Sequence, residues 1–238
     1  MILVMFIAII YFAVFLRSFL CPQHPHVLNV YFGVPGSGKT TFAAYLTKWA
    51  LHENAIIRFC RKNQNFITLP ILRSKYLKRR IPVYSNVPIT GAYKLDAKAD
   101  IGNFMIENAK VIIDEAGIEY NNRRYKDFPQ EAVYFYKYHR HYRVSVDVFS
   151  QSYEDMDVTL RRLAQNFYVV RRSLIPFCIV ARRIRRKVGV DEQTKQIADL
   201  YSMGMPILDT KRIFSPPLWK LFNSYSRKEL PQKKWERW

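Results

Sequence analysis

The chain has 238 residues, enough for one large domain with its own core or for one domain with appendages. Hydrophobic residues make up 49% of it and aromatic residues 15%, which excludes an intrinsically disordered chain. Lys and Arg number 38 against 19 Asp and Glu, and the formal net charge of +19 favours a polyanionic partner, either nucleic acid or an anionic membrane surface.

An uncharged apolar run occupies residues 2–16, ILVMFIAIIYFAVFL. A helix over it covers roughly 22 Å, and it spans a hydrocarbon core of about 30 Å if Arg17 snorkels and residues 18–20 continue the helix. A buried core helix and a cleaved signal peptide are the alternatives. The signal peptide is disfavoured because no basic residue precedes the run and no small-x-small site follows it. We therefore expect a single transmembrane helix over residues 1–20, with the basic remainder in the cytoplasm.

Residues 21–26 (CPQHPH) predict an irregular linker between this anchor and the following domain. The three cysteines, Cys21, Cys60 and Cys178, are far apart and odd in number. They form neither a disulfide framework nor a C-x-x-C metal pattern, which is typical of a reducing compartment.

A strand predicted at residues 27–32 leads into a glycine-rich loop, and residues 41–51 then have apolar side chains at helical spacing. The loop fits G-x-x-x-x-G-K-[ST] at every position. Its glycines let consecutive backbone N–H groups surround a phosphate, and the helix aims its positive dipole end at the same anion. Lys39 is expected to reach the β- and γ-phosphates of ATP, and the Thr40 hydroxyl to hold Mg²⁺. The predicted nucleotide-binding residues are Gly33, Pro35, Gly36, Ser37, Gly38, Lys39, Thr40 and Thr41. The alternative is a glycine loop that only turns the chain.

The next segments are less informative. Residues 55–60 are compatible with a short strand, and the basic residues 61–80 indicate either a solvated face or contacts to a phosphate backbone. Residues 83–87 predict a second sheet strand, and residues 90–103 a loop or an edge excursion.

A second carboxylate motif, KVIIDEAG, occupies residues 110–117. Its apolar run is typical of a parallel strand buried on both faces, and it ends in Asp114 and Glu115. In Walker-B geometry Asp114 orders the Mg²⁺ shell, and Glu115 polarises the water that attacks the γ-phosphate. A strand end capped by acidic residues is the alternative.

A helix is predicted over residues 128–142, ending in the HRH of residues 139–141. Its two histidines point to different sides of a helix, which argues against zinc and leaves a positively charged helix end. Residues 143–150 alternate like a strand that ends before Gln151. At the end of a strand beside the Walker-B strand, Gln151 is our candidate for sensing the γ-phosphate or orienting water.

Residues 155–164 predict a helix that carries Arg161 and Arg162, and residues 166–171 predict a further strand. In a ring, an arginine of one subunit can complete the site of its neighbour and stabilise transition-state charge. Arg161 is our candidate for this role, with a surface ion pair as the equal alternative.

Six motifs together resemble the Zot-like (zonular occludens toxin domain) family, the assembly ATPases of filamentous phages, related to the FtsK–HerA group. They are GVPGSGKTT (33–41), VYSNVP (83–88), VIIDEAG (111–117), HRH (139–141), VFSQSYEDMD (148–157) and LRRLAQ (160–165). The resemblance covers about residues 27–172. It implies an inner-membrane ATPase that drives virion assembly and extrusion of single-stranded DNA, with phage coat or assembly proteins as partners. Lys39, Thr40, Asp114, Glu115 and Gln151 stand at the positions of its active residues. Family members typically carry their membrane segment after the ATPase domain, whereas here it precedes it.

The carboxyl-terminal third is basic. Residues 173–190 indicate strands or a hairpin outside the core sheet, and their cluster from Arg182 to Lys187 indicates a solvated patch, or contacts to DNA backbone or anionic lipid. Residues 206–238 form a Pro- and Trp-rich tail suited to docking on a partner, a neighbouring subunit or the bilayer interface.

The resulting fold prediction is a three-layer α/β P-loop domain over residues 27–172, followed by a basic accessory segment (173–205) and the tail (206–238). Its mainly parallel sheet uses strands near 27–32, 83–87, 110–114, 144–150 and 166–171, and the additional strand between P-loop and Walker B favours a motor over a nucleotide kinase. We expect a Mg²⁺-dependent ATP hydrolase at the host inner membrane, in a homo-oligomeric ring for which a hexamer is one candidate. An FtsK–HerA-type DNA packaging or translocation motor, a small-molecule kinase and a non-hydrolysing DNA- or membrane-binding module are the alternatives.

Overall fold

A computed structural model describes residues 26–53, 58–59, 62, 80–119, 129–190 and 197–223. The expected transmembrane helix, nearly all of the linker, most of residues 54–79 and the end of the tail lie outside this described part. Within it, no helix combines the length and the apolar character that crossing a bilayer requires.

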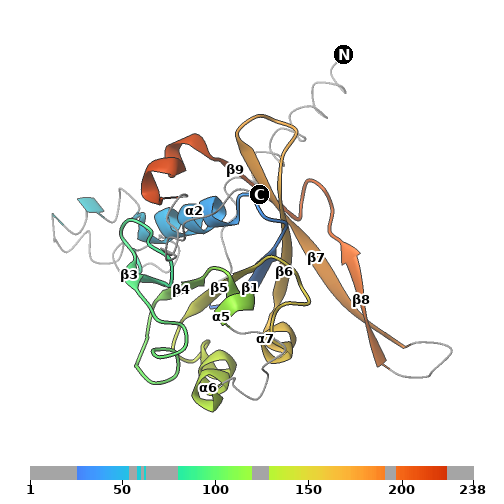
Figure 1. Cartoon of the computed structure of the whole chain (residues 1–238), viewed down its shortest axis with the longest axis horizontal. Coiled ribbons are helices and arrows are strands. Elements are labelled where there is room, and N and C mark those ends of the chain that lie inside the picture. The colour runs from blue at the N-terminus through green and yellow to red at the C-terminus, as the bar shows by residue number, and fades with distance from the viewer. Residues whose placement is uncertain are drawn as a thin grey trace, which may run out of the picture.

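Within the described residues, a sheet of nine strands organises the fold (Figure 1). In chain order the strands are β1 (Leu28–Phe32), β2 (Val83–Ser85), β3 (Tyr93–Lys94), β4 (Lys110–Ile113), β5 (Ser145–Ser150), β6 (Asn166–Arg172), β7 (Cys178–Val190), β8 (Ile197–Met203) and β9 (Thr210–Phe214). The spatial order is β3-β2-β4-β5-β1-β6-β7-β8, with β9 also paired to β7.

The strands from β3 to β6 in this order are all parallel, whereas β7 pairs antiparallel with β6, β8 and β9. The predicted mainly parallel sheet is therefore confirmed, and β3 lies at its edge. β5 lies between β1 and β4, so one strand separates the glycine loop from the Walker-B strand. The carboxyl ends of β1, β4 and β5 meet at one edge of the sheet, where open α/β sheets bind their ligands.

Helices cover both faces of the sheet, which confirms the three layers (Figure 1). The helix α2 (Lys39–Leu51) and the 3₁₀ helix η2 (Pro216–Leu221) lie on one face, and α6 (Gln130–Tyr138) and α7 (Val158–Leu163) on the other. The alternation along β1 divides the two cores, because Val30 packs on the α6–α7 side and Tyr31 on the α2 side. Tyr31 stacks between Phe149 and Tyr168, with ring centroids 4.8 and 4.9 Å away.

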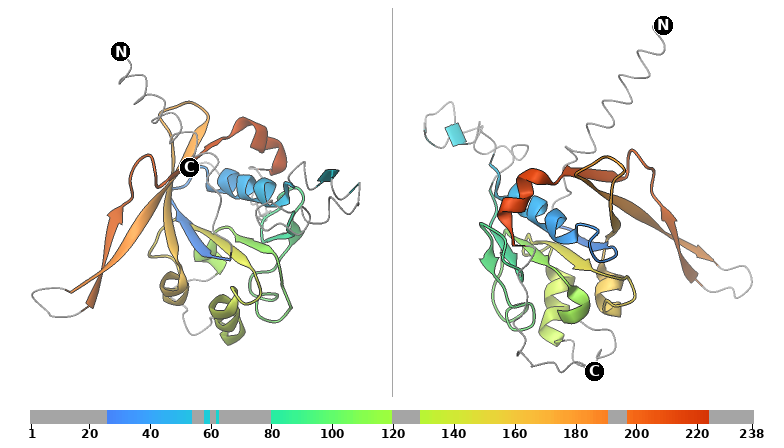
Figure 2. Two further views of the ribbon diagram at one scale, coloured as in Figure 1. Left: turned by 180° about the vertical axis from the view of Figure 1, so that it is seen from behind. Right: turned by 45° about the horizontal axis from the view of Figure 1, so that its top comes forward.

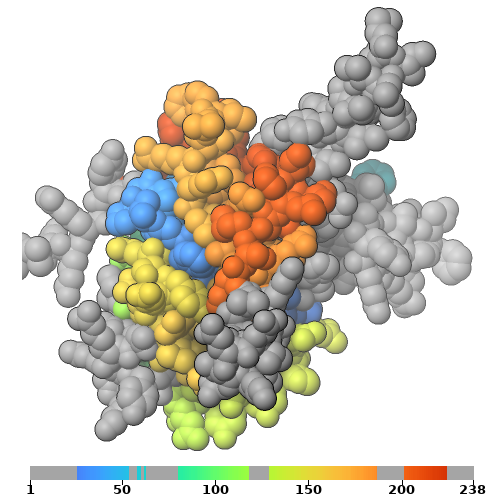
Figure 3. Space-filling model, turned by 90° about the vertical axis from the view of Figure 1, so that its right-hand side faces the viewer, coloured from blue at the N-terminus to red at the C-terminus, as the bar shows by residue number. Residues whose placement is uncertain are grey.

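The carboxyl-terminal third departs from the prediction. Instead of lying outside the core sheet, β7 pairs with β6 from Phe167↔Ile184 to Arg172↔Ile179, and β9 extends the sheet beyond it. Ile179 packs into the α2-side core, as does Leu218 of η2, so part of the expected tail belongs to this domain. Beyond β6, β7 continues with β8 as a two-stranded arm that projects from the body (Figure 2). On the face seen in Figure 3, the strands of the carboxyl-terminal third (orange) lie beside the blue and yellow segments of the domain.

The helix predicted over residues 128–142 is shorter, since α6 ends at Tyr138 and Arg143 (φ 56°) closes the following turn. His139 is buried, and its Nδ1 lies 2.7 Å from the carbonyl oxygen of Tyr136. Burial lowers the pKa of His139, which favours its neutral form. The positive charge expected at this helix end is therefore not supplied by His139.

A polar network crosses four neighbouring strands inside the α2-side layer. The buried Lys110 on β4 forms an ion pair with the buried Asp147 on β5. Asn29 Nδ2 on β1 donates to Asp147 Oδ1 (2.7 Å), and Asn166 Nδ2 on β6 donates to Asn29 Oδ1 (2.8 Å). The network fixes the register of these strands, because a slip would leave buried charge unpaired.

Candidate nucleotide site

The glycine loop is shaped by its own sequence. Ser37 N donates to the carbonyl oxygen of Val34 (3.1 Å), which closes a turn with Pro35 at its second position and Gly36 (φ 75°) at its third. Proline followed by a residue with positive φ is the pattern of a type II turn. Gly38 (φ 96°) then leads directly into α2.

The loop is also held by the hairpin of β6 and β7. A Cβ atom at Gly33 would lie 2.3 Å from the carbonyl oxygen of Val170, and one at Gly38 would lie 2.5 Å from Ile179 Cδ1. These two glycines are therefore required by close packing as well as by the approach of a phosphate.

The amino-terminal end of α2 is suited to an anion. It has no side-chain cap and no acidic residue in its first turn, and the N–H of Phe42 is the donor to Gly38 O. The preceding N–H groups, those of Lys39, Thr40 and Thr41, are left outside the helix's own ladder. Together with the helix dipole they favour a phosphate group. The loop and α2 form a P-loop.

Lys39 lies across this P-loop. Its Nζ donates to the carbonyl oxygens of Gly33 (2.7 Å) and Val34 (3.2 Å), and the residue is 8% exposed. Burial lowers the pKa of Lys39, while the charges of Asp114 and Glu115 act in the opposite direction. An anionic phosphate would replace the two carbonyl contacts and favour the charged ammonium.

The predicted metal ligands meet at the end of β4. Thr40 Oγ1 donates to Asp114 Oδ2 (2.7 Å), and Asp114 is 3% exposed. Mg²⁺ takes hard oxygen ligands, usually one or two carboxylates together with substrate phosphates and waters. In the described part of the chain no three His, Cys, Asp or Glu residues cluster as a metal cage. One hydroxyl and one carboxylate beside a P-loop fit a Mg²⁺ ion that arrives with a nucleotide.

Asn86 is a site residue that the sequence reasoning did not assign. Its Nδ2 donates to the carbonyl oxygen of Asp114 and its Oδ1 accepts from Asp114 N, both at 2.8 Å. The side chain thereby continues the β2–β4 pairing by one residue after Ser85, the last residue of β2. Its only sequence signal was its position at the end of a predicted strand.

Glu115 and Gln151 lie at the same edge of the sheet. Glu115 is exposed, has φ 52°, and donates its N–H to Asp114 Oδ1 (3.0 Å). Such a backbone conformation is uncommon for a residue other than glycine and is held here by the turn after β4. Gln151 is exposed and follows Ser150, which pairs with Phe32 directly before the P-loop. The structure therefore brings both candidates to the strand ends that flank the loop.

The structure does not place Arg161 in the P-loop. It lies on α7, with its guanidinium carbon 4.9 Å from the ring centroid of Tyr153. Its role in the site of a neighbouring subunit stays a prediction. A different arginine reaches the loop, since Arg172 Nε donates to the carbonyl oxygen of Gly36 (2.9 Å).

Two arginines of the basic cluster are bonded within the carboxyl-terminal strands. Arg182 donates from Nε (2.8 Å) and Nη2 (2.6 Å) to the carbonyl oxygen of Gly204, and Arg185 pairs with Asp209 at 2.7 Å. These contacts join β7 to the turn before β9. Both side chains therefore help to hold β7 against the segment between β8 and β9.

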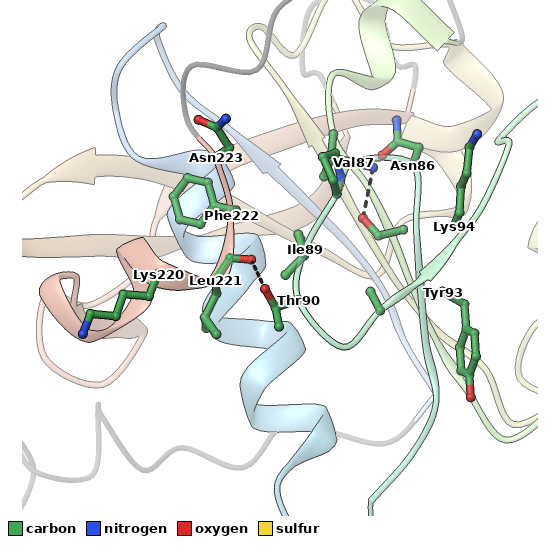
Figure 4. Close-up of a pocket in the computed structure, with 13 residues that line it drawn as sticks. Asn86, Val87, Ile89, Thr90, Tyr93, Lys94, Lys220, Leu221, Phe222 and Asn223 are labelled. Atoms are coloured by element: carbon green, nitrogen blue, oxygen red, sulfur yellow. Dashed lines mark hydrogen bonds between the residues drawn. The ribbon is translucent and has the colours of Figure 1, made fainter.

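A cavity of about 780 Å³ lies between the segment after β2 and the end of η2 (Figure 4). Thr90 Oγ1 bonds to the carbonyl oxygen of Leu221 (3.0 Å) across it, and Lys94 and Lys220 lie at its edges. None of its lining residues belongs to the P-loop, but Asn86 forms part of its wall. The cavity and the candidate metal site thus share one residue.

No family model matches the chain, and no curated protein matches its sequence. Among solved structures it is similar to the N-terminal domain of zonular occludens toxin from Neisseria meningitidis (16% identity, 84% of this chain and 100% of that chain, TM-score 0.49). It is also similar to the genome packaging NTPase B204 of Sulfolobus turreted icosahedral virus 2 (13%, 78% and 100%, TM-score 0.39) and to the RadB recombinase (14%, 82% and 95%, TM-score 0.42). At these identities and TM-scores the similarities do not assign a function to this chain. A function has to be argued from the residues described above.

Proposed function

We propose that the chain is a Mg²⁺-dependent ATP hydrolase that powers the assembly of a filamentous virion and the extrusion of its single-stranded DNA at the host inner membrane. The observation that carries the hydrolase proposal is the hydrogen bond between Thr40 Oγ1 and Asp114 Oδ2. It joins the two predicted Mg²⁺ ligands beside the P-loop and the buried Lys39.

Each residue has a defined task in this reaction. The N–H groups of the P-loop and the Lys39 ammonium bind and orient the β- and γ-phosphates. Thr40 and Asp114 would hold Mg²⁺, which would supply positive charge against the negative charge that develops during phosphoryl transfer. Glu115 accepts a proton from the attacking water, and Gln151 orients that water.

The process that ATP hydrolysis drives, virion assembly and DNA extrusion, is proposed from the motif resemblance and from the charge of the chain. A formal net charge of +19 suits a polyanionic cargo, and the apolar run at residues 2–16 followed by Arg17 suits a single-pass anchor with the hydrolase in the cytoplasm. Since hydrolysis coupled to transport commonly uses a ring, a homo-oligomer, with a hexamer as one candidate, is part of the proposal.

The test is ATP hydrolysis by the full chain in detergent, beside Lys39→Ala, with and without single-stranded DNA. We expect release of free phosphate, its loss in the variant, and stimulation by DNA. Phosphate transfer to an added small acceptor in place of release would support the kinase alternative. Turnover that is indifferent to DNA would contradict DNA as the coupled cargo and leave the hydrolase proposal standing.

A further inference from the structure

The end of β6 runs alongside the P-loop. The last pair between β1 and β6 is Phe32↔Val169, after which the chain of β1 turns into the loop while β6 continues for three more residues. Successive residues of a strand point to opposite faces. Tyr168 and Val170 pack on the α2 side, so Arg172 points to that side and Arg171 to the other.

The hairpin of β6 and β7 contacts the P-loop at each of its three glycines. Val170 backs Gly33 and Ile179 backs Gly38, while Arg172 binds Gly36 between them. Arg172 Nη2 lies 3.9 Å from the position that a Cβ atom of Gly36 would take. The guanidinium is therefore held at the rim of the loop by a charge-assisted bond from one of its nitrogens.

Arg172 has no acidic partner among the residues that the structure describes. Its one hydrogen bond there uses Nε, and the side chain is exposed, so both Nη groups remain available. Arg182 and Arg185, by contrast, are bonded within the carboxyl-terminal strands. A planar guanidinium with free donors beside a phosphate site matches the bidentate recognition of phosphate oxygens.

We propose that Arg172 is a phosphate-contacting residue supplied by the same subunit, whose Nη groups bind the γ-phosphate when ATP occupies the P-loop. This rests on the proposed function of the site. The positive charge balances the charge on the transferring phosphoryl group, and it distinguishes ATP from ADP because only ATP carries the γ-phosphate. A residue that merely fixes the loop through Gly36 would affect both nucleotides alike.

The test compares Arg172→Ala, Arg172→Lys and the matched control Arg171→Ala with the wild type. Fluorescent ATP and ADP analogues report affinity with Mg²⁺ present, and steady-state hydrolysis reports kcat and KM. For Arg172→Ala we expect ADP affinity to be retained, ATP affinity to fall by about 10- to 100-fold, and kcat to fall by roughly 100-fold. Arg172→Lys keeps the positive charge but lacks the planar guanidinium, so its ATP affinity and kcat should lie between those of the wild type and Arg172→Ala. The ATP affinity and kcat of Arg171→Ala should match those of the wild type.

Equal weakening of ATP and ADP in Arg172→Ala would identify a residue that only fixes the loop, and would overturn the inference. An Arg172→Ala variant whose nucleotide affinities and kcat equal those of Arg171→Ala would also overturn the inference. In both cases a wild type that hydrolyses ATP keeps the proposed function intact. A wild type that binds neither nucleotide would overturn the proposed function and the inference together.

Discussion

Asn86 offers a test of how the candidate metal site is built. Replacing it with alanine removes two hydrogen bonds of 2.8 Å, one to the carbonyl oxygen and one to the N–H of Asp114. A neutral hydrogen bond contributes about 0.5–1.5 kcal/mol, so the pair contributes about 1–3 kcal/mol to the position of Asp114. Because the Asp114 carboxylate is the proposed Mg²⁺ ligand, this energy should appear in the metal requirement.

For Asn86→Ala the free Mg²⁺ concentration that gives half-maximal hydrolysis should therefore rise by about 5- to 150-fold at saturating ATP. The assay is a Mg²⁺ titration of phosphate release, with thermal unfolding measured in parallel. Thr90→Val is the matched control, since Thr90 lines the same cavity as Asn86 and bonds to Leu221 instead of Asp114. An unchanged Mg²⁺ requirement in Asn86→Ala would show that these two hydrogen bonds do not position Asp114 for the metal.

Three further predictions follow from packing and charge. Gly33→Ala places a Cβ atom 2.3 Å from the carbonyl oxygen of Val170, so it should lower the unfolding free energy by about 1–3 kcal/mol and should also lower the affinity for ATP. Unchanged urea unfolding together with an unchanged ATP titration would contradict this. Asp147→Asn removes the buried carboxylate charge that pairs with Lys110 and should cost about 3–5 kcal/mol in urea unfolding, and a cost of under about 1 kcal/mol would contradict the network. Burial lowers the pKa of Lys39, so the affinity for ATP should fall as pH rises through that lowered pKa, and ATP binding should be accompanied by proton uptake. ATP titrations from about pH 7 to about pH 10 test this, and an affinity that falls only at the ordinary lysine pKa would contradict it.

The parts of the site that the sequence predicts are those whose chemistry is local. The P-loop works through consecutive residues, and its turn follows from Pro35 and Gly36 in order. The strand of four buried residues before Asp114 is read directly from its apolar run. Hence the five parallel strands of the predicted sheet agree with the structure to within a few residues.

The parts that it misses depend on distant partners. Asn86 bonds to a residue 28 positions away and Arg172 to one 136 positions away, and nothing in the neighbouring sequence indicates either contact. The arginine density of β7 conceals its place in the core sheet, because Gly204 and Asp209 bind two of its arginines only once the chain has folded. Local patterns carry no information on such pairings.

We propose that this site hydrolyses ATP with Glu115 as the base. This proposal is tested most directly by identifying the nucleotide that stays bound after Glu115→Gln is incubated with Mg²⁺ and ATP and then separated from free nucleotide. We expect Glu115→Gln to retain intact ATP, the wild type to retain ADP, and Lys39→Ala to retain neither nucleotide. Recovery of ADP from Glu115→Gln at the wild-type rate would contradict the claim.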